Sequence, residues 1–170
     1  MGADRRGGFR EARLHPHIPK SLSPGEPALP DGGPWLRNGW YWSDQGYDQD
    51  LERAVAYVCQ QTGCPNLANF LRAQSHEETG YGRLFTSINN FWNMGAIDSN
   101  PQAAARYMTP EAGGQGWLDF LGWSNPRSTY ARFKLLAQEG IEDVYALAAA
   151  IKAGGWATDP TYAQDVASKL

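Results

Sequence analysis

The sequence has no uninterrupted apolar run of 18 residues, so no segment of it is expected to cross a membrane as a helix. It also lacks a basic excess, because 15 Lys and Arg stand against 18 Asp and Glu. A surface for nucleic acid needs such an excess, so nucleic acid is not expected as a partner. The N-terminus, MGADRRGGFREARLHPH, carries positive charge but no apolar core, and the pattern therefore predicts no secretory signal.

Cysteine and histidine are scarce, with two Cys and three His. Cys59 and Cys64 form no CxxC pair and have no matching His spacing, so the sequence predicts no zinc site and no other metal or cofactor. A disulfide across so short a loop is geometrically possible but adds little stability, and two free, half-buried thiols are favoured.

Proline is concentrated at one end of the chain, since residues 1–34 contain six of the 11 prolines. No helical or strand period runs through this segment, which predicts an extended arm followed by one domain at residues 35–170. Two roles are open for the arm. It wraps its own domain, or it is held by a partner.

Apolar side chains in the rest of the chain recur at helical spacing, which predicts a mainly α fold. Residues 111–116, EAGGQG, are predicted as a loop or as the turn of a small β-hairpin, and residues 117–123 as a short amphipathic piece. The predicted helices cover residues 48–61, 66–79, 102–107, 129–138, 142–153 and 160–170.

The helix predicted at residues 66–79 carries a carboxylate where a leucine would be ordinary. On a helical wheel four side chains fall within roughly 60° of one another: Leu67, Leu71, Gln74 and Glu78. Burial in this stripe and the negative end of the helix dipole both raise the pKa of a carboxyl group. A carboxylic acid that is protonated near neutral pH can act as a general acid, and Glu78 is the candidate. The adjacent Glu77 falls at the rim of the stripe.

Three motifs follow one another in the chain: AQSHEETGYGR at residues 73–83, NNFWNMGAIDSNP at 89–101 and GGWATDPTYAQDVASKL at 154–170. In this order they resemble the peptidoglycan N-acetylglucosaminidase family, the lysozyme-like glucosaminidase domains of bacterial autolysins, flagellar muramidases and phage lysins. The resemblance covers about residues 50–170. It implies a lysozyme-like fold, and it places the family's catalytic acid on Glu78.

Cleavage of a glycosidic bond commonly uses a second carboxylate besides the acid. Glu111 lies roughly where the family places its second acidic residue, and Asp119 is the neighbouring option. Asp98 and Asp159 are more simply explained as a turn residue and a helix cap. A 2-acetamido sugar can also supply its own nucleophile, in which case Glu78 suffices alone.

The second and third motifs are predicted to bind the glycan, with aromatic rings stacking on sugars and amides binding the acetamido group. The chain departs from the family at Trp156, where a tyrosine is usual, so Tyr162 or Tyr81 would have to supply the hydroxyl. The substrate-binding candidates are Gln74, Tyr81, Asn90, Phe91, Trp92, Asn93, Trp156 and Tyr162.

The resemblance implies a peptidoglycan hydrolase that cuts the β-1,4 bond between N-acetylglucosamine and N-acetylmuramic acid. Two alternatives stay open: a lytic transglycosylase or muramidase on the same glycan, and a structural virion or partner-bound protein with a degenerate cleft. Without a signal sequence, such an enzyme would reach the wall through phage lysis, a virion or a secretion apparatus. The N-terminal arm would then bind a virion or secretion-system protein.

Overall fold

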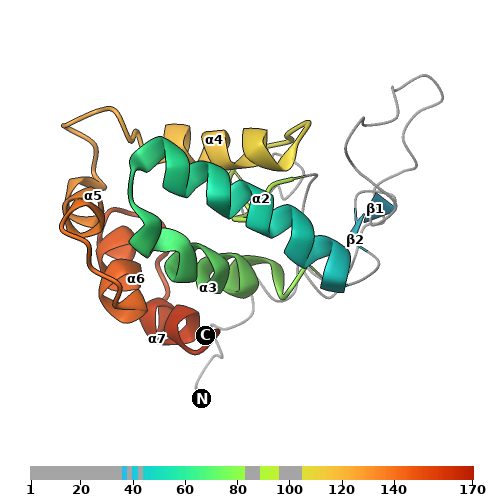
Figure 1. Ribbon diagram of the computed structural model, residues 1–170. Helices are drawn as coiled ribbons and strands as arrows, with labels where there is room; N and C mark the ends of the chain where they lie inside the picture. Colours follow the sequence, from blue (N-terminus) through green and yellow to red (C-terminus); the bar gives the residue numbers. More distant parts are fainter. Residues whose placement is uncertain (1–35, 38–39, 42–43, 83–88, 96–104) are drawn as a thin grey trace, which may run out of the picture.

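The computed structural model describes residues 36–37, 40–41, 44–82, 89–95 and 105–170, and the arm predicted at residues 1–34 lies outside this part (Figure 1). The described part is mainly α-helical, as predicted. Its helices are α2 (Asp44–Thr62), the 3-10 turn η1 (Pro65–Leu67), α3 (Ala68–Thr79), α4 (Pro110–Phe120), α5 (Ala131–Gln138), α6 (Val144–Ala153) and α7 (Tyr162–Ala167).

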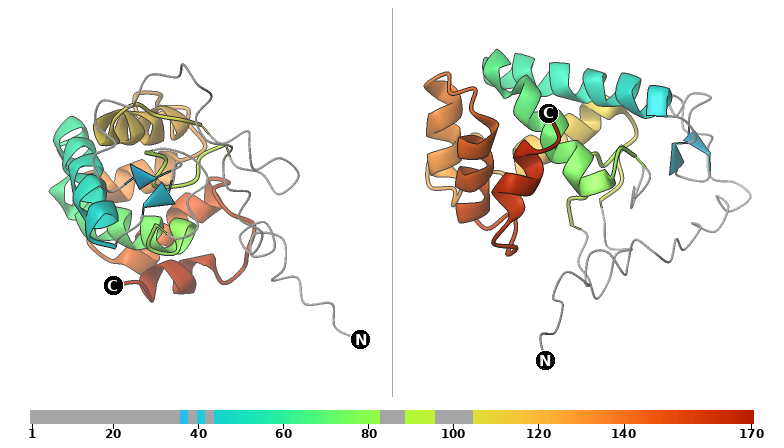
Figure 2. Two further views of the ribbon diagram at one scale, coloured as in Figure 1. Left: turned by 90° about the vertical axis from the view of Figure 1, so that its right-hand side faces the viewer. Right: turned by 90° about the horizontal axis from the view of Figure 1, so that it is seen from below.

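The helices form two groups. Helix α2 lies between α3 and α4, while α5, α6 and α7 gather at the end of the molecule where α2 turns into α3 (Figures 1 and 2). Two short strands, β1 (Leu36–Arg37) and β2 (Trp40–Tyr41), pair antiparallel ahead of α2. The sequence did not predict this pair. None of the helices in the described part is both long and apolar enough to cross a membrane.

Helix α3 has the start and end that its sequence predicts. Pro65 opens the 3-10 turn that leads into it, because a proline loses no hydrogen bond at a first helical position. Gly80 ends the helix in the left-handed conformation, with φ of 56°, which glycine adopts without a steric penalty. Glu78 is therefore in the last turn of α3.

Residues 111–116 are part of α4, so the prediction of a loop or hairpin there is wrong. Thr109 caps the helix, since its side chain accepts a hydrogen bond from the backbone N–H of Ala112 at 3.1 Å. Pro110 occupies the first helical position. The sequence therefore contains both signals of a helix start, Thr109 and Pro110. The glycines that follow them are typical of a loop, which is why a loop was predicted.

The glycines of α4 permit close approach to its neighbours. A Cβ atom at Gly113 would lie 2.0 Å from the carbonyl oxygen of Asn89, and one at Gly114 would lie 3.0 Å from the carbonyl oxygen of Ala54 in α2. Side chains at these positions would push α4 away from both. The packing therefore compensates for the low helix propensity of glycine.

The helix predicted at residues 102–107 is not confirmed. Residues 102–104 lie outside the described part, and residues 105–107 are not helical. The other predicted helices are present with shifted ends. Cys59 and Cys64 are both free thiols, Cys59 half-buried and Cys64 buried.

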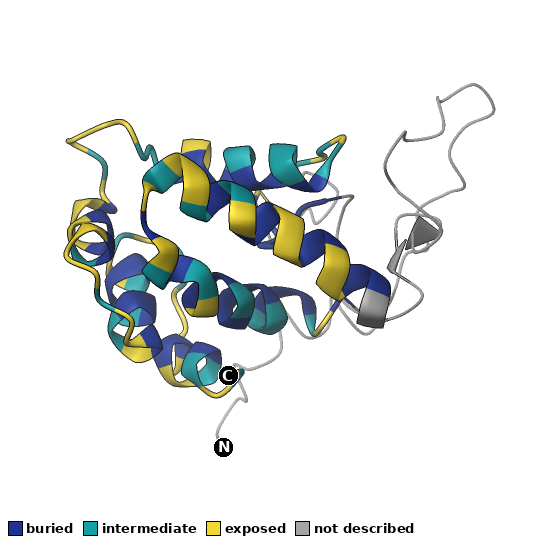
Figure 3. Cartoon of the chain, in the orientation of Figure 1, coloured by how far each residue is buried: buried dark blue, intermediate teal, exposed yellow. Residues whose placement is uncertain are grey.

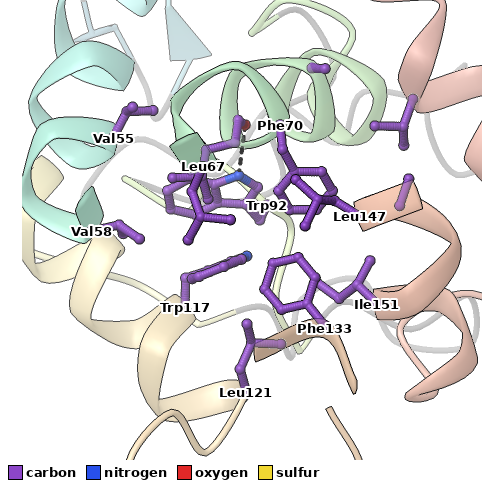
Figure 4. Close-up of a cluster of buried hydrophobic side chains, with 14 of the residues drawn as sticks. Val55, Val58, Leu67, Phe70, Trp92, Trp117, Leu121, Phe133, Leu147 and Ile151 are labelled. Atoms are coloured by element: carbon purple, nitrogen blue, oxygen red, sulfur yellow. Dashed lines mark hydrogen bonds between the residues drawn. The ribbon is translucent and has the colours of Figure 1, made fainter. Parts of the chain in front are cut away.

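The core is built from large aromatic side chains between the two groups of helices (Figure 4). Trp117 of α4 lies in its middle, with its ring centroid 5.7 Å from Trp92 and 5.9 Å from Phe133 of α5. Phe70 of α3 packs against Phe133 at 5.2 Å. The inward faces of α2, α3 and α4 are accordingly buried, while their outward faces are exposed (Figure 3).

Candidate active site

Three chain segments meet at the carboxylate of Glu78. Its side chain accepts hydrogen bonds at Oε1 from the indole N–H of Trp156 at 2.9 Å and from the hydroxyl of Tyr162 at 3.1 Å. Glu78 comes from α3, Trp156 follows α6, and Tyr162 begins α7. Only 8% of Glu78 is exposed. A nearly buried carboxylate must have hydrogen-bond donors, and these two supply them.

The direction of the Tyr162 hydrogen bond follows from a buried chain of side chains behind it. The indole N–H of Trp117 can only donate, so the atom of Gln74 that it meets at 3.2 Å is the amide oxygen. The amide NH₂ of Gln74 is then turned toward the Tyr162 oxygen, at 3.1 Å. Since Tyr162 accepts from Gln74, its own proton is available for Glu78.

Burial and charge also favour the protonated hydroxyl of Tyr162, the form that can donate. Burial raises the pKa of its hydroxyl well above the usual value, and the negative charge of Glu78 raises it further. Both donors, Trp156 and Tyr162, bind the same oxygen of the Glu78 carboxyl group, Oε1.

The carboxylate next in the chain has different surroundings. Glu77 is partly exposed and forms an ion pair with Lys169, 3.2 Å away. His76 is on another face of α3, where it stacks on Tyr81 with ring centroids 4.3 Å apart. Tyr81 is 41% exposed, and its hydroxyl is not among the partners that the structure gives to Glu78. Of the two tyrosines considered from the sequence, Tyr162 is the one that reaches the carboxylate.

Asn90, predicted to bind substrate, is instead part of the loop's own structure. Its side-chain NH₂ donates to the carbonyl oxygens of Met94 and Ala105, at 2.8 and 3.2 Å, and its amide oxygen accepts from the backbone N–H of Met94 at 2.8 Å. Asn90 is fully buried. These bonds hold the loop in shape and leave no donor for a ligand.

Phe91 and Trp92 were predicted as a substrate floor, and this prediction is wrong. Phe91 is 0% and Trp92 1% exposed, so neither ring can meet a sugar. The indole N–H of Trp92 donates to the carbonyl oxygen of Leu71 at 3.1 Å. A dashed line marks this hydrogen bond at Trp92 in Figure 4. Asn93, also in this loop, donates to the backbone carbonyl of Glu78. It therefore supports the end of α3 that bears the acid.

The two proposed second carboxylates are engaged elsewhere. Glu111, in the first turn of α4, receives two hydrogen bonds from the Arg53 guanidinium of α2, at 2.9 and 3.1 Å. Partial burial acts to raise the pKa of Glu111, but its own backbone N–H and Arg53 outweigh that effect and lower the pKa. Asp119 is exposed and accepts from Gln115 at 2.8 Å. Both carboxylates are thus bound by side chains of α2 or α4.

The remaining acidic candidates do not add a partner for Glu78. Asp159 accepts from the backbone N–H and the hydroxyl of Thr161, at 2.8 and 2.7 Å, and so stabilises the turn that begins α7. Asp98 lies outside the described residues. In the part of the chain that the structure describes, no group of three or more potential metal ligands occurs.

Two residues near the site were not singled out from the sequence. Trp117 fixes the amide of Gln74, and Phe120 packs edge-to-face on Trp156 with ring centroids 5.1 Å apart. A buried tryptophan needs an acceptor for its N–H, which is the signal that would have connected Trp117 with Gln74. No sequence signal connects Phe120 with Trp156, because their contact depends on how α4 and α6 pack.

Comparisons of the chain with family models, with curated proteins and with solved structures find no match. The arrangement around Glu78 therefore has to be interpreted from its own chemistry.

Proposed function

We propose that this protein is a peptidoglycan glycosidase in which Glu78 is the general acid. The observation that carries the proposal is the nearly buried Glu78 carboxyl group, held by Trp156 and Tyr162 at the end of the buried face of α3. Two of the three motifs that resemble glucosaminidases meet at this carboxyl group. Glu78 belongs to the motif at residues 73–83, and Trp156 and Tyr162 belong to the motif at residues 154–170. The proposed bond is the β-1,4 link between N-acetylglucosamine and N-acetylmuramic acid.

In this proposal Glu78 donates its proton to the glycosidic oxygen as the bond to the leaving sugar breaks. Trp156 and Tyr162 then stabilise the carboxylate that remains, because both donate to Oε1. Neither donor has to move during the step. The two donors thus favour the carboxylate form that Glu78 takes once its proton has been transferred.

The attack on the anomeric carbon is assigned to the substrate. Glu111 and Asp119 are bound to Arg53 and Gln115, so neither is assigned as base or nucleophile. The 2-acetamido oxygen of N-acetylglucosamine can form a bond to the anomeric carbon while the glycosidic bond breaks, and water opens the resulting ring afterwards. This route needs one carboxyl group from the protein, which is what the described site provides.

A test compares Glu78→Gln with Glu77→Gln on purified cell wall in a zymogram. The two residues are adjacent and carry the same group, but Glu77 pairs with Lys169 at the surface. Glu78→Gln should lower the rate by about 10²- to 10⁴-fold, the range of a lost general acid, while Glu77→Gln keeps most of the activity. Equal loss from both variants, or normal digestion by Glu78→Gln, would refute the proposal.

Mass spectrometry of the digested wall tests the bond. A new reducing N-acetylglucosamine end supports the glucosaminidase. A reducing N-acetylmuramic acid end identifies a muramidase, and an anhydro end identifies a lytic transglycosylase. Glu78 would serve as acid in all three reactions.

One observation favours a second function, a wall-binding or structural protein with a degenerate cleft. Trp156 stands where the resembling family has a tyrosine, and an indole can donate a hydrogen bond but cannot exchange a proton as a hydroxyl does. A wild-type protein that sediments with cell wall but releases no fragments would establish this alternative.

A further inference from the structure

Phe120 is an exposed aromatic side chain one ring away from the Glu78 site. It is the last residue of α4, 49% exposed, and its ring packs edge-to-face on Trp156 at 5.1 Å. The indole of Trp156 in turn donates to Glu78. Single exposed aromatics are common and need no explanation by themselves. Phe120 differs because its neighbour is a direct partner of the carboxylate.

A third ring lies along the same side of α4. A Cβ atom added at Gly116 would lie 2.2 Å from both Cζ and the hydroxyl oxygen of Tyr107, so the absence of a side chain at Gly116 makes room for that ring. Gly116 and Phe120 are four residues apart on a helix and are therefore neighbours on one face. Tyr107 is half-buried, and it covers α4 one turn before Phe120.

We propose that Phe120, flanked by Trp156 and Tyr107, is a stacking site for a sugar ring of the glycan strand next to the bond at Glu78. This inference rests on the proposed function. A pyranose offers an apolar C–H face that suits an aromatic ring. The glycosidic oxygen has to lie within hydrogen-bond reach of the Glu78 carboxyl group, which brings the adjoining sugars alongside Trp156 and its neighbour Phe120.

The ligand class follows from the composition of this row. Its members are aromatic rings, and Tyr130 packs on the Phe120 ring as well, with centroids 6.2 Å apart, so the row suits the apolar face of a sugar. The polar groups beside it, the Tyr107 hydroxyl and the exposed Asp119 carboxylate, suit the sugar hydroxyls at the edge of that face. The muramic acid peptides are not required for it. An unsubstituted N-acetylglucosamine oligomer, which contains no peptide, is therefore a sufficient probe.

The experiment measures binding of chitotetraose by calorimetry in the Glu78→Gln background, where the sugar is not consumed. Phe120→Ala should weaken binding about tenfold, within the range of lost aromatic contacts, and Phe120→Tyr should keep it because the ring remains. Tyr145→Ala is the matched control, since Tyr145 on α6 is an aromatic residue of similar exposure, 48%, and lines a hollow with Ala149 and Lys152 that includes no member of the row. Its affinity should stay at the parent value.

Unchanged affinity in Phe120→Ala, or equal weakening in Tyr145→Ala, would overturn the stacking site. A parent protein that binds no oligosaccharide would overturn it as well. The wild-type zymogram distinguishes failure of the stacking site from failure of the proposed function. If the wild-type protein digests wall but Phe120→Ala binds the sugar normally, only the stacking site is refuted. Absence of both binding and digestion refutes the glycosidase itself.

Discussion

The hydroxyl of Tyr162 lies 3.1 Å from Oε1 of Glu78 and is aimed at it by the Gln74 amide. The two residues are 84 positions apart in the chain. Gln74 is itself oriented by Trp117, so the hydrogen-bond donor to the acid is set by a buried side chain of α4. The acid, its donor and the residues that orient the donor are thus one connected unit.

Tyr162→Phe tests the effect of this donor on the acid. The hydroxyl stabilises the carboxylate form of Glu78, so its removal should raise the Glu78 pKa. An acid has to be protonated to act, and the rate falls as pH rises through its pKa. The alkaline fall of the pH–rate profile should therefore move to higher pH. The raised pKa of Tyr162 means that its own ionisation does not contribute to that fall.

The same shift can be read without activity from the indole N–H resonance of Trp156, which contacts the carboxylate. Its chemical shift should titrate with Glu78, and the midpoint should rise in Tyr162→Phe. A Tyr145→Phe variant provides the control, because it removes a hydroxyl from the exposed face of α6. An unmoved midpoint in Tyr162→Phe would show that the hydroxyl does not affect the acid.

Glu111→Gln separates a structural from a catalytic role at that position. Its ion pair with Arg53 is partly exposed, with side-chain exposures of 37% and 45%, so the loss of unfolding free energy should be below about 1 kcal/mol. The folded-state pKa of Glu111 is lowered, so this stabilisation exists above the unfolded-state pKa of about 4.3 and disappears as pH falls through the folded value.

Urea unfolding measures the difference in unfolding free energy between wild type and Glu111→Gln. This difference should be smaller in acid than near neutral pH. Wall digestion should continue at close to the wild-type rate. A loss of digestion rate as large as that of Glu78→Gln would show that Glu111 is catalytic and would contradict this prediction.

Trp92→Ala should destabilise the fold strongly without a specific effect on sugar binding. The side chain is almost fully buried, and a tryptophan-to-alanine change in a core costs about 3–5 kcal/mol. Trp92→Phe keeps most of the volume but leaves the Leu71 carbonyl without its indole donor, which costs about 1–3 kcal/mol. Urea midpoints measure both. An unfolding free energy unchanged in Trp92→Ala would mean that Trp92 is not in the core.

Gly113→Ala and Gly116→Ala form a pair that tests the packing of α4. A methyl group at residue 113 meets the backbone carbonyl of Asn89, which cannot rotate away, and should cost about 3 kcal/mol. At residue 116 it meets the far end of the Tyr107 side chain, which can move, so the cost should be smaller. Thermal unfolding compares them. Equal midpoints for the two variants would contradict this account of α4.

The sequence predicts well what is decided locally. The 3.6-residue period, Pro65 and Gly80 place α3 almost completely. Asp143 caps α6, a local signal that the start predicted at residue 142 did not use. These signals act within one turn of the helix end. The position of Glu78 on the buried side of α3 follows from the same periodicity.

The sequence fails where a contact with a distant segment decides. Residues 111–116 are glycine-rich and suggest a loop, but approach to Asn89 and to α2 makes them helical. Asn90 and Trp92 have the chemistry of ligand-binding residues, but their partners are backbone atoms inside the protein. Which partner a polar or aromatic side chain finds depends on the folded neighbourhood, which no local pattern encodes.

The long separation between Glu78 and its donors also has a consequence for synthesis. A ribosome adding about 5–20 residues per second needs about 4 to 17 seconds to travel the 84 residues from Glu78 to Tyr162. During that interval the acid exists on the nascent chain without the indole and hydroxyl that hold it. The arrangement of donors around Glu78 therefore arises only after residue 162 has left the ribosome.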